Sequence, residues 1–377
     1  MTPGERPASH PGSASTAVGV LGVGVYLPPE VRRNDWWPGE VVARWRAGEA
    51  GAGDPVRPEP DGGAPRSPGA RLTLVAMEAL KDDPFGGARE RRIMPRGMKS
   101  SDMEVEAVKD ALGRSGVPSD RVGLLLTNSQ LPDHLAAPSA PLLHHRLGLP
   151  ASCPAFGLDA SSNSFLAQLR VAAPMVASGE IEAAVLVQSS GFAHLAPADD
   201  PHSAWFGDGA TAVVVGRVAD GFGLLADAHR TSGALFDALV VGCPGSTWYA
   251  SRDRGAALYV GDHGAARRML LGLADNAKEV VDEALSKAGR SPGQIDFYAA
   301  HQGTAWFRQV TQEYLGLHRA RSFDSFRWTG SLGPANIPFM LAMGEREGML
   351  QGGHLVVAHG GGSGVTYSAA VLRWGAA

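Results

Sequence analysis

Between residues 156 and 172, a short apolar segment is followed by a run of small polar residues and then by a helical pattern. After the polar run 159–164, apolar side chains recur at the three- to four-residue spacing of a buried helix face: Phe165, Leu169 and Ala172. This pattern predicts a strand that leads through a short turn into a helix.

Ser164 is the residue of this turn to which we assign chemistry. It precedes the first apolar position of the helix, so its hydroxyl is predicted at the positive end of the helix dipole, where chain geometry favours a nucleophile. Helices also prefer serine and asparagine as caps, and Ser161, Ser162 and Asn163 fit that purely structural role. The pattern alone leaves both interpretations open.

The first buried strand is predicted at residues 17–28, where glycines alternate with branched apolar residues. Residues 1–16 are rich in Pro, Ser and Gly, and we expect them to be disordered. Between residues 39 and 69 the chain is rich in Ala, Gly and Pro and poor in large apolar residues. That composition predicts a mobile surface insertion.

Two segments of the chain resemble each other at a constant separation. Residues 110–116 (Asp-Ala-Leu-Gly-Arg-Ser-Gly) and 283–289 (Glu-Ala-Leu-Ser-Lys-Ala-Gly) each combine a helical pattern with a glycine stop. A Pro-containing turn and a β-rich run follow in both, the runs starting at residues 122 and 295. Matching positions lie 173 residues apart throughout, which indicates two copies of one unit.

The two copies also end alike, with a glycine turn that leads into a β-rich run at residues 207–215 and 362–372. Helices that alternate with strands predict right-handed βαβ units and mostly parallel sheets covered by helices. We therefore predict an α/β protein of two duplicated halves, residues 17–217 and 218–377, packed as a layered sandwich.

Composition excludes several classes of function. The chain has 377 residues, 44% hydrophobic and 19% charged, with a formal net charge of -4, which argues against nucleic acid or an anionic membrane as a partner. No apolar run reaches the roughly 18 to 20 residues that span a bilayer, and no signal-peptide pattern is present, so we expect a cytoplasmic protein. Cys153 and Cys243 are far apart and suggest neither a disulfide framework nor a zinc site. Both are expected to be buried.

His301 is the second residue with candidate chemistry. The repeat aligns it with Asn128, at the predicted carboxyl end of a strand, where the sites of α/β folds gather. A histidine after a strand is often purely structural. Its pairing with a serine nucleophile in the other copy favours the catalytic interpretation.

Five motifs in one order resemble the β-ketoacyl-acyl-carrier-protein synthase III family of the thiolase superfamily. They are Cys-Pro-Ala-Phe with Asp159 and a nucleophile position five residues on, Trp205–Ala210, His301-Gln302-Gly303, Gly330–Pro338 and Gly360-Gly-Gly362. The resemblance runs from about residue 17 to the end, apart from the 39–69 stretch. It implies the five-layer αβαβα thiolase sandwich and a homodimer.

The family's catalytic Cys, His and Asn would correspond to Ser164, His301 and Ser331, so two of the three have changed. Serine is a poor unassisted nucleophile, so Ser164 needs a base, and His301 is the candidate. Ser331 offers one donor proton where an asparagine amide offers two. The resemblance places the oxyanion hole at the backbone N–H of Ser164 and one in the Gly362-Ser363 turn.

The resemblance also suggests residues that could bind the substrate. Trp205, Phe206, Asn336 and His359 are possible substrate-binding residues, and Asn336 or His359 could supply the missing amide donor. The Trp and Arg with which the family holds coenzyme A have no counterpart near residues 81–85. The donor is then an acyl-CoA or an acyl carrier protein thioester, with no other cofactor and no metal.

The resemblance with its two replacements favours an acyltransferase of secondary metabolism, such as polyketide biosynthesis. Ser164 would pass an acyl group from the thioester to an oxygen, nitrogen or carbon acceptor, a small molecule. One alternative is a serine-dependent starter-unit synthase that catalyses decarboxylative Claisen condensation, which His301 permits and the lost asparagine opposes. Another is a catalytically silent partner subunit, which the retained His301 argues against.

Overall fold

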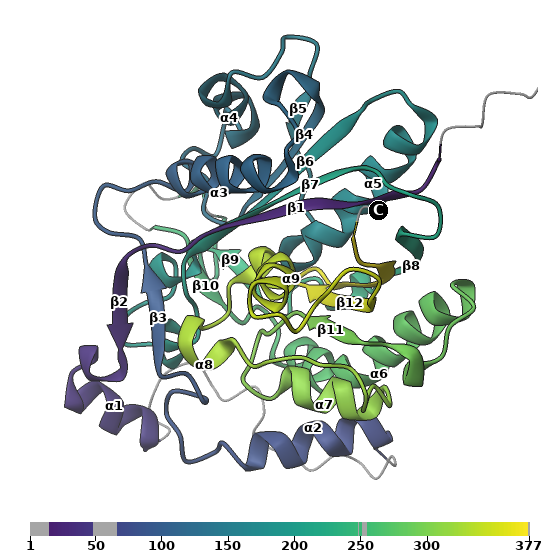
Figure 1. Cartoon of the computed structure of the whole chain (residues 1–377). Helices are drawn as coiled ribbons and strands as arrows, with labels where there is room; N and C mark the ends of the chain where they lie inside the picture. The colour runs from purple at the N-terminus through teal and green to yellow at the C-terminus, as the bar shows by residue number, and fades with distance from the viewer. Residues whose placement is uncertain (1–14, 48–65, 248, 251–254, 376–377) are drawn as a thin grey trace, which may run out of the picture.

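Two β-sheets form the frame of the molecule, and a pair of helices lies between them (Figure 1). The structure, a computed structural model, describes residues 15–47, 66–247, 249–250 and 255–375. Within these residues the first sheet has the strand order β1-β7-β6-β4-β5 and the second the order β11-β12-β13-β8. The strands of the first sheet are β1 (Val18–Tyr26), β4 (Val122–Ser129), β5 (Ala155–Gly157), β6 (Ala183–Ser190) and β7 (Gly209–Arg217). Those of the second are β8 (Gly223–Thr231), β11 (Phe297–Ala300), β12 (Leu355–Gly362) and β13 (Thr366–Arg373).

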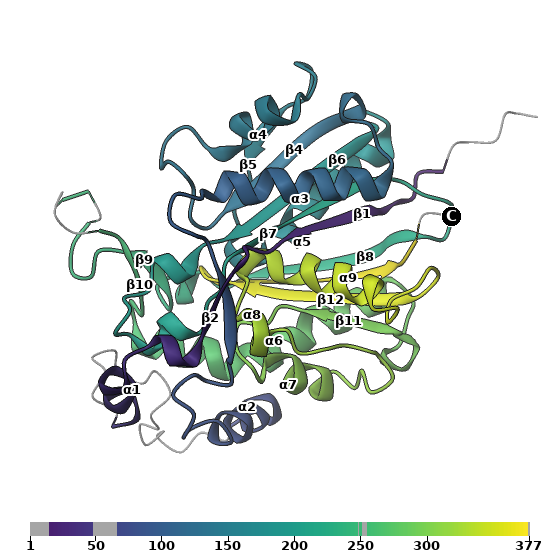
Figure 2. The same ribbon diagram turned by 60° about the vertical axis from the view of Figure 1, so that its left-hand side comes forward.

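The helices complete five layers, which are clearest in Figure 2. The outer face of the first sheet is covered by α3 (Ser100–Ser115) and α4 (Ser139–Leu147). The space between the sheets holds α5 (Ser164–Ser178) and α9 (Asn336–Arg346). The outer face of the second sheet carries α6 (His263–Lys287), against which α7 (Phe307–Tyr314) and α2 (Pro68–Glu78) pack. The predicted αβαβα sandwich is confirmed.

The smaller elements lie at one end of the sandwich. They are α1 (Gly39–Arg46), α8 (Phe326–Thr329), and two antiparallel strand pairs, β2 (Glu30–Arg33) with β3 (Glu90–Ile93) and β9 (Val240–Gly242) with β10 (Ala257–Tyr259).

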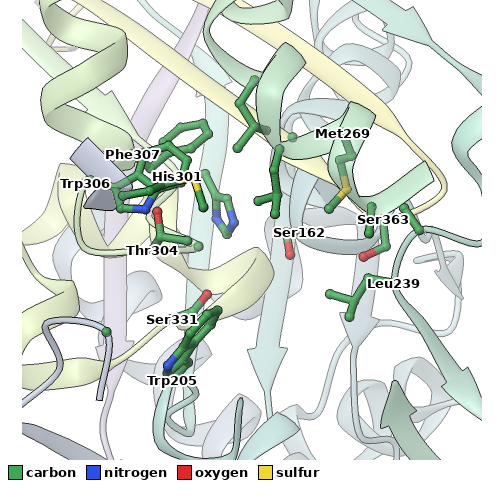
Figure 3. Close-up of a pocket in the computed structure, with 18 of the residues that line it drawn as sticks. Ser162, Trp205, Leu239, Met269, His301, Thr304, Trp306, Phe307, Ser331 and Ser363 are labelled. Carbon is green, nitrogen blue, oxygen red and sulfur yellow. The ribbon is translucent and has the colours of Figure 1, made fainter. Parts of the chain in front are cut away.

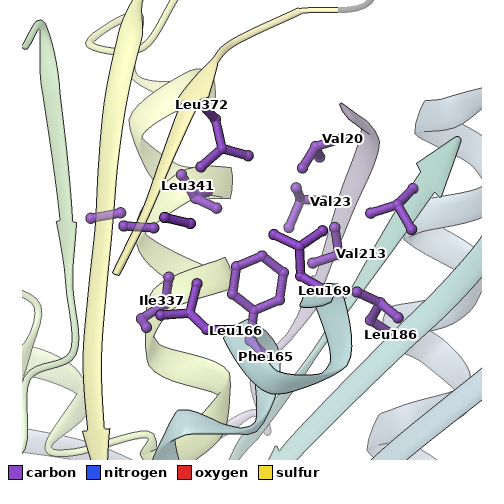
Figure 4. Packing of buried hydrophobic residues seen from close by; sticks show 14 of the residues in the cluster. Val20, Val23, Phe165, Leu166, Leu169, Leu186, Val213, Ile337, Leu341 and Leu372 are labelled. Carbon is purple, nitrogen blue, oxygen red and sulfur yellow. The ribbon is translucent and has the colours of Figure 1, made fainter. Parts of the chain in front are cut away.

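The main hydrophobic core lies between the two sheets (Figure 4). Phe165 and Leu169 of α5 pack there with Ile337 and Leu341 of α9, and β1 adds residues such as Val23. All of these side chains are at most 2% exposed. Full burial of one such side chain stabilises the fold by about 1.5–3 kcal/mol. This packing against the two sheets holds the first turns of α5 and α9 at fixed positions.

The internal repeat extends to the central layer. Gly116 after α3 and Gly289 after α6 both adopt the left-handed conformation, with φ of 69° and 62°, which explains why both stops are glycine. α5 starts at Ser164 and α9 at Asn336, while the matching strands β6 and β12 start at Ala183 and Leu355. The two central helices are therefore equivalent elements of the two copies.

The predicted mobile insertion at residues 39–69 is wrong at both of its ends. Residues 39–46 form α1, whose Val42 and Trp45 are buried, and the Trp45 indole donates a 2.6 Å hydrogen bond to the Asp199 carbonyl. Ser67 caps α2, accepting the Ala70 N–H at 3.0 Å. The high Gly and Pro content of the whole stretch obscured the short amphipathic segment that contains Trp45. Residues 48–65, like residues 1–14 of the predicted disordered N-terminus, lie outside the described residues.

Both cysteines are buried, as expected. No helix in the described ranges is long and apolar enough to span a bilayer. Within those same ranges, no three His, Cys, Asp or Glu side chains are placed together to hold a metal ion.

Candidate active site

A cavity of about 830 Å³ opens beside the start of α5 and the carboxyl ends of β11 and β12. The polar side chains that line it include Ser162, His301, Ser331 and His359. Figure 3 shows the hydroxyls of Ser162 and Ser331 and the imidazole of His301 around a common space. The cavity is of the size expected for a small-molecule site.

Ser162 owes its position to a strained turn. The preceding residue, Ser161, has φ of +52°, a conformation that costs a non-glycine residue about 1–2 kcal/mol. The Asp159 carboxylate holds that turn, because it accepts the Ser161 N–H at 2.6 Å and an N–H of the Asn128 amide at 2.8 Å. The turn directs the Ser162 side chain into the cavity, one residue before the end of a 3-10 turn, 161–163, that leads into α5.

Ser164 does not reach this cavity, which corrects the prediction that it is the nucleophile. Its side chain is fully buried, its hydroxyl donates to the Ser161 carbonyl at 2.7 Å, and it accepts the Ala160 N–H at 2.8 Å. Its backbone N–H is also used, in a hydrogen bond to Ser161. Ser164 therefore closes the first turn of α5, and it offers neither a nucleophile nor an oxyanion donor.

The sequence pattern missed Ser162 for a physical reason. Apolar periodicity predicted the helix start correctly, because α5 begins at Ser164. The polar run contains three serines, and periodicity does not show which of them faces the cavity. The positive φ of Ser161 leaves no trace in composition.

His301 directly follows β11, as predicted, and its backbone N–H donates to the His359 carbonyl on β12 at 2.8 Å. Its imidazole is 8% exposed and lines the cavity. Burial lowers the pKa of His301 to about 4, with the Gly333 backbone opposing the change. The ring is therefore neutral near pH 7 and has a lone pair available for a proton.

Ser331 is held by a bridge to the segment that contains Trp205 and Phe206. The Ser331 N–H donates to the Trp205 carbonyl at 2.7 Å, and the Gly207 N–H donates to the Ser331 carbonyl at 3.1 Å. Gly207 fits there because a Cβ would lie 1.9 Å from the Thr329 carbonyl oxygen. Trp205, Phe206 and Ser331 all line the cavity, so the structure brings these predicted residues together.

Asn336 is not part of the site, which corrects its prediction as a substrate-binding residue or replacement amide. Its carboxamide oxygen accepts the Gln302 N–H, and its amide donates to the Ser325 hydroxyl at 3.3 Å. The side chain is fully buried and does not line the cavity. Both of its polar ends are occupied at the start of α9.

The Gly362-Ser363 turn lies against the backbone of Ser162. A Cβ added to Gly362 would come within 3.1 Å of the Ser162 nitrogen and 2.4 Å of the Ala160 oxygen, so only glycine permits this approach. Gly362 and Ser363 line the cavity next to Ser162. The two backbones thus form one wall of the site.

Apolar side chains form much of the remaining wall. They come from α6 and from the segments around β9 and β10: Met269, Leu270, Leu273, Leu239 and Val260. The apolar spacing in α6 indicates that one face of this helix is covered, but the sequence does not show whether that face borders a cavity or a packed core. Such a lining suits an acyl chain.

The segment near residues 81–85 contributes charges to the cavity. Lys81 and Asp83 line it, while Phe85 packs in an aromatic cluster with Trp37 and Trp45. The absence of the family's Trp and Arg at this point was expected, and Lys81, which pairs with Glu78, is the basic residue present there.

Two family models match the chain. The model described as 3-oxoacyl-[acyl-carrier-protein] synthase III matches residues 156–233, and the one for the C-terminal part of that protein matches residues 285–374. The β-ketoacyl-[acyl-carrier-protein] synthase III of Sodalis glossinidius is 29% identical over 289 residues, which span 76% of this chain and 88% of that protein.

Solved structures of the same kind superpose over most of the chain. 3-Oxoacyl-(acyl carrier protein) synthase III of Pseudomonas aeruginosa is 25% identical with a TM-score of 0.73, covering 95% of this chain and 98% of that one. The Thermus thermophilus synthase III is also 25% identical, with a TM-score of 0.74, covering 95% and 100%. The predicted resemblance is thereby confirmed: the chain is similar to β-ketoacyl-acyl-carrier-protein synthase III and has the thiolase fold.

Proposed function

We propose that the protein is an acyltransferase in which Ser162 accepts an acyl group from a thioester and passes it to a small-molecule nucleophile. The observation that carries this proposal is the meeting of the Ser162 hydroxyl, His301 and Ser331 around one cavity with an apolar wall. The cavity offers a nucleophile, a neutral base and room for an acyl chain.

In the first half-reaction His301 takes the proton of the Ser162 hydroxyl while the oxygen attacks the thioester carbonyl. The oxyanion that forms is stabilised by the Ser162 N–H and by the adjoining Gly362-Ser363 turn. When the C–S bond breaks, the thiolate recovers the proton from His301, and an acyl ester of Ser162 remains. The donor is an acyl-CoA or an acyl carrier protein thioester, as for the synthases that the chain resembles.

Decarboxylative condensation is the second candidate. It needs a donor that stabilises negative charge on the oxygen of the extender's thioester, and losing one such donor typically costs about 10²–10³ in rate. Ser331 can donate only one proton, and Asn336 is occupied elsewhere. The site therefore favours transfer to a nucleophilic acceptor over carbon dioxide release.

We propose that the enzyme acts in secondary metabolism, because two residues of the catalytic set of the family it resembles are replaced. We also propose a homodimer. β5 is a three-residue edge strand of the first sheet, and its Phe156 is 44% exposed, so this edge is open for pairing with a second copy. Size-exclusion chromatography with light scattering measures the oligomeric state directly.

A panel of labelled acyl thioesters tests the function. The purified protein is incubated with acetyl-, propionyl-, butyryl- and malonyl-CoA and with the same groups on a carrier protein, and adducts are measured by intact-protein mass spectrometry. We expect a covalent adduct with at least one donor and its discharge by an added alcohol or amine. A protein that no donor acylates would be the silent partner subunit, and stoichiometric carbon dioxide with a β-keto product would establish the condensing enzyme.

A further inference from the structure

His359 is a second imidazole in the cavity that the chemistry of Ser162 and His301 does not use. It lies on β12, paired with Ala300 at the end of β11, so it is the direct neighbour of His301. Its ring stacks on Phe307 with centroids 5.7 Å apart and planes only 2° from parallel. The side chain is 2% exposed and lines the cavity.

A chain of three hydrogen bonds fixes which ring nitrogen of His359 carries the proton. The Thr311 hydroxyl lies 2.8 Å from the Phe307 carbonyl and 3.2 Å from the Arg308 carbonyl, so its proton must point to one of these acceptors. Its oxygen then accepts the proton of the Tyr298 hydroxyl, 2.9 Å away. The Tyr298 oxygen in turn accepts from Nδ1 of His359 at 3.2 Å.

This order of donors leaves Nε2 of His359 with its lone pair. Among the described residues no group forms a hydrogen bond with Nε2, and the ring borders the cavity. Burial, together with repulsion from His301 when that ring is protonated, lowers the pKa of His359 to about 3, so the ring is neutral near pH 7. His359 therefore presents a hydrogen-bond acceptor to the cavity and cannot replace the amide donor that the site lacks.

We propose that Nε2 of His359 is the base that receives the proton of the acceptor, so that the acceptor is an alcohol or amine rather than a carbanion. This inference rests on the proposed acyl transfer through Ser162. An enolate has no proton to give and would be repelled by a lone pair, whereas an O–H or N–H group is aligned and activated by it.

The second half-reaction then balances as follows. The acceptor oxygen or nitrogen attacks the acyl carbon of the Ser162 ester while its proton passes to Nε2 of His359. The bond between the acyl carbon and Ser162 Oγ breaks, and Oγ takes that proton from the imidazolium. The oxyanion present during this step is a nearby negative charge, which favours the imidazolium and opposes the effect of burial. The Tyr298 oxygen faces the Nδ1–H of the charged ring and stabilises it.

His359→Phe is the decisive variant. Phenylalanine retains the stacking on Phe307, and the Tyr298 hydroxyl still donates to Thr311, so no buried donor is left without a partner. The two half-reactions are measured separately, acylation by rapid-quench mass spectrometry and discharge of the isolated acyl-enzyme by ethanol and by trifluoroethanol. General base catalysis typically contributes about 10²–10⁴ in rate, so we expect discharge by ethanol to slow by that factor and acylation to slow by less than about tenfold. Trifluoroethanol, the more acidic alcohol, should show a smaller loss than ethanol.

Tyr298→Phe provides a second test should His359→Phe not fold, as judged by circular dichroism and thermal melting. It removes the acceptor that fixes the tautomer, and it too should slow discharge more than acylation. Equal slowing of both half-reactions by the folded variant, or unchanged discharge, overturns the role of His359. A wild-type protein that is never acylated, or that is acylated at another residue, instead overturns the proposed function on which this inference rests.

Discussion

The starts of α5 and α9 are equivalent positions of the two copies, and the segments that precede them contribute to the cavity in different ways. At α5 a strained turn points Ser162 into the cavity, and Ser164 closes the first helical turn. At α9 the corresponding Asn336 is fully buried and bonded to Gln302 and Ser325. Both helix starts are thus closed, and the preceding segments reach the cavity instead, through Ser162 before α5 and Ser331 before α9.

The polar residues at the ends of strands β4 and β11 also have different roles in the two copies. Asn128 at the end of β4 supports the turn through Asp159, whereas His301, its counterpart after β11, faces the cavity. In the proposed function the first copy thus contributes the nucleophile, Ser162, and the second contributes the base, His301. This division explains why neither copy is complete alone.

The largest effect is expected for the two serines at the α5 start. Ser162→Ala should abolish acylation by thioesters, a loss of at least about 10³-fold, because it removes the attacking oxygen. Ser164→Ala should retain acylation within about tenfold and lower the free energy of unfolding by about 1–2 kcal/mol through two lost hydrogen bonds. Rapid-quench mass spectrometry and urea unfolding measure the two quantities. A reversed pattern would restore Ser164 as the nucleophile.

Two neighbouring glycines test the wall that lies against the Ser162 backbone. Gly362→Ala places a Cβ 2.4 Å from the Ala160 oxygen and 3.1 Å from the Ser162 nitrogen, so the oxyanion site should be displaced and acylation should fall by about 10²–10³. Gly361→Ala is the matched control, because its Cβ would meet nothing closer than 3.5 Å. Similar acylation rates for the two variants would show that the Gly362 backbone takes no part.

Ser331→Asn tests the side of the site that precedes α9. The variant restores the asparagine that the resembled family carries at this position, and its amide offers two donor protons where the serine hydroxyl offers one. With malonyl-CoA we expect carbon dioxide release to rise by about tenfold or more over the wild type. The radiolabelled gas is measured directly, and Ser331→Ala is the control without any donor. An unchanged release in Ser331→Asn would mean that the loss of the amide does not determine the reaction type.

The last prediction is a dependence of stability on pH. The pKa of His301 is about 4 in the folded protein against 6.5 for an ordinary histidine. The unfolded chain therefore binds more protons between these values, and stability present above about pH 6.5 is lost as the pH falls toward 4. At about 1.4 kcal/mol per pKa unit this loss is up to about 3 kcal/mol. His301→Gln should reduce the loss, measured by urea unfolding at pH 7 and pH 4.5, and an unchanged loss would show that His301 is not the group responsible.

The fold could be predicted from the sequence more completely than the site. The 173-residue separation predicted two copies, and both of its glycines, Gly116 and Gly289, adopt the left-handed conformation that makes them necessary. His301 was located because a strand end is a robust feature of a βαβ unit. The predicted nucleophile, Ser164, lies two residues from the serine that faces the cavity, because the backbone conformation of Ser161 decides which serine does so.

The predictions for residues 39–46 and for Asn336 are wrong for the same reason. Trp45 and Val42 form a short buried face within a stretch whose overall composition indicates a loop, and Asn336 stands near the site in sequence while both of its polar ends are occupied. In each case a tertiary partner, the Asp199 carbonyl for Trp45 and Gln302 for Asn336, decides the role of the residue. Such partners are distant in sequence, and no local pattern reports them.

Mapping the acylated residue tests the central claim most directly. The wild-type protein is incubated with the thioester that labels it best, digested, and the peptide that spans residues 155–170 is sequenced by tandem mass spectrometry. The account predicts the acyl group on Ser162, with Ser161 and Ser164 unmodified. An acyl group on Ser164, or on a residue outside this peptide, would contradict it.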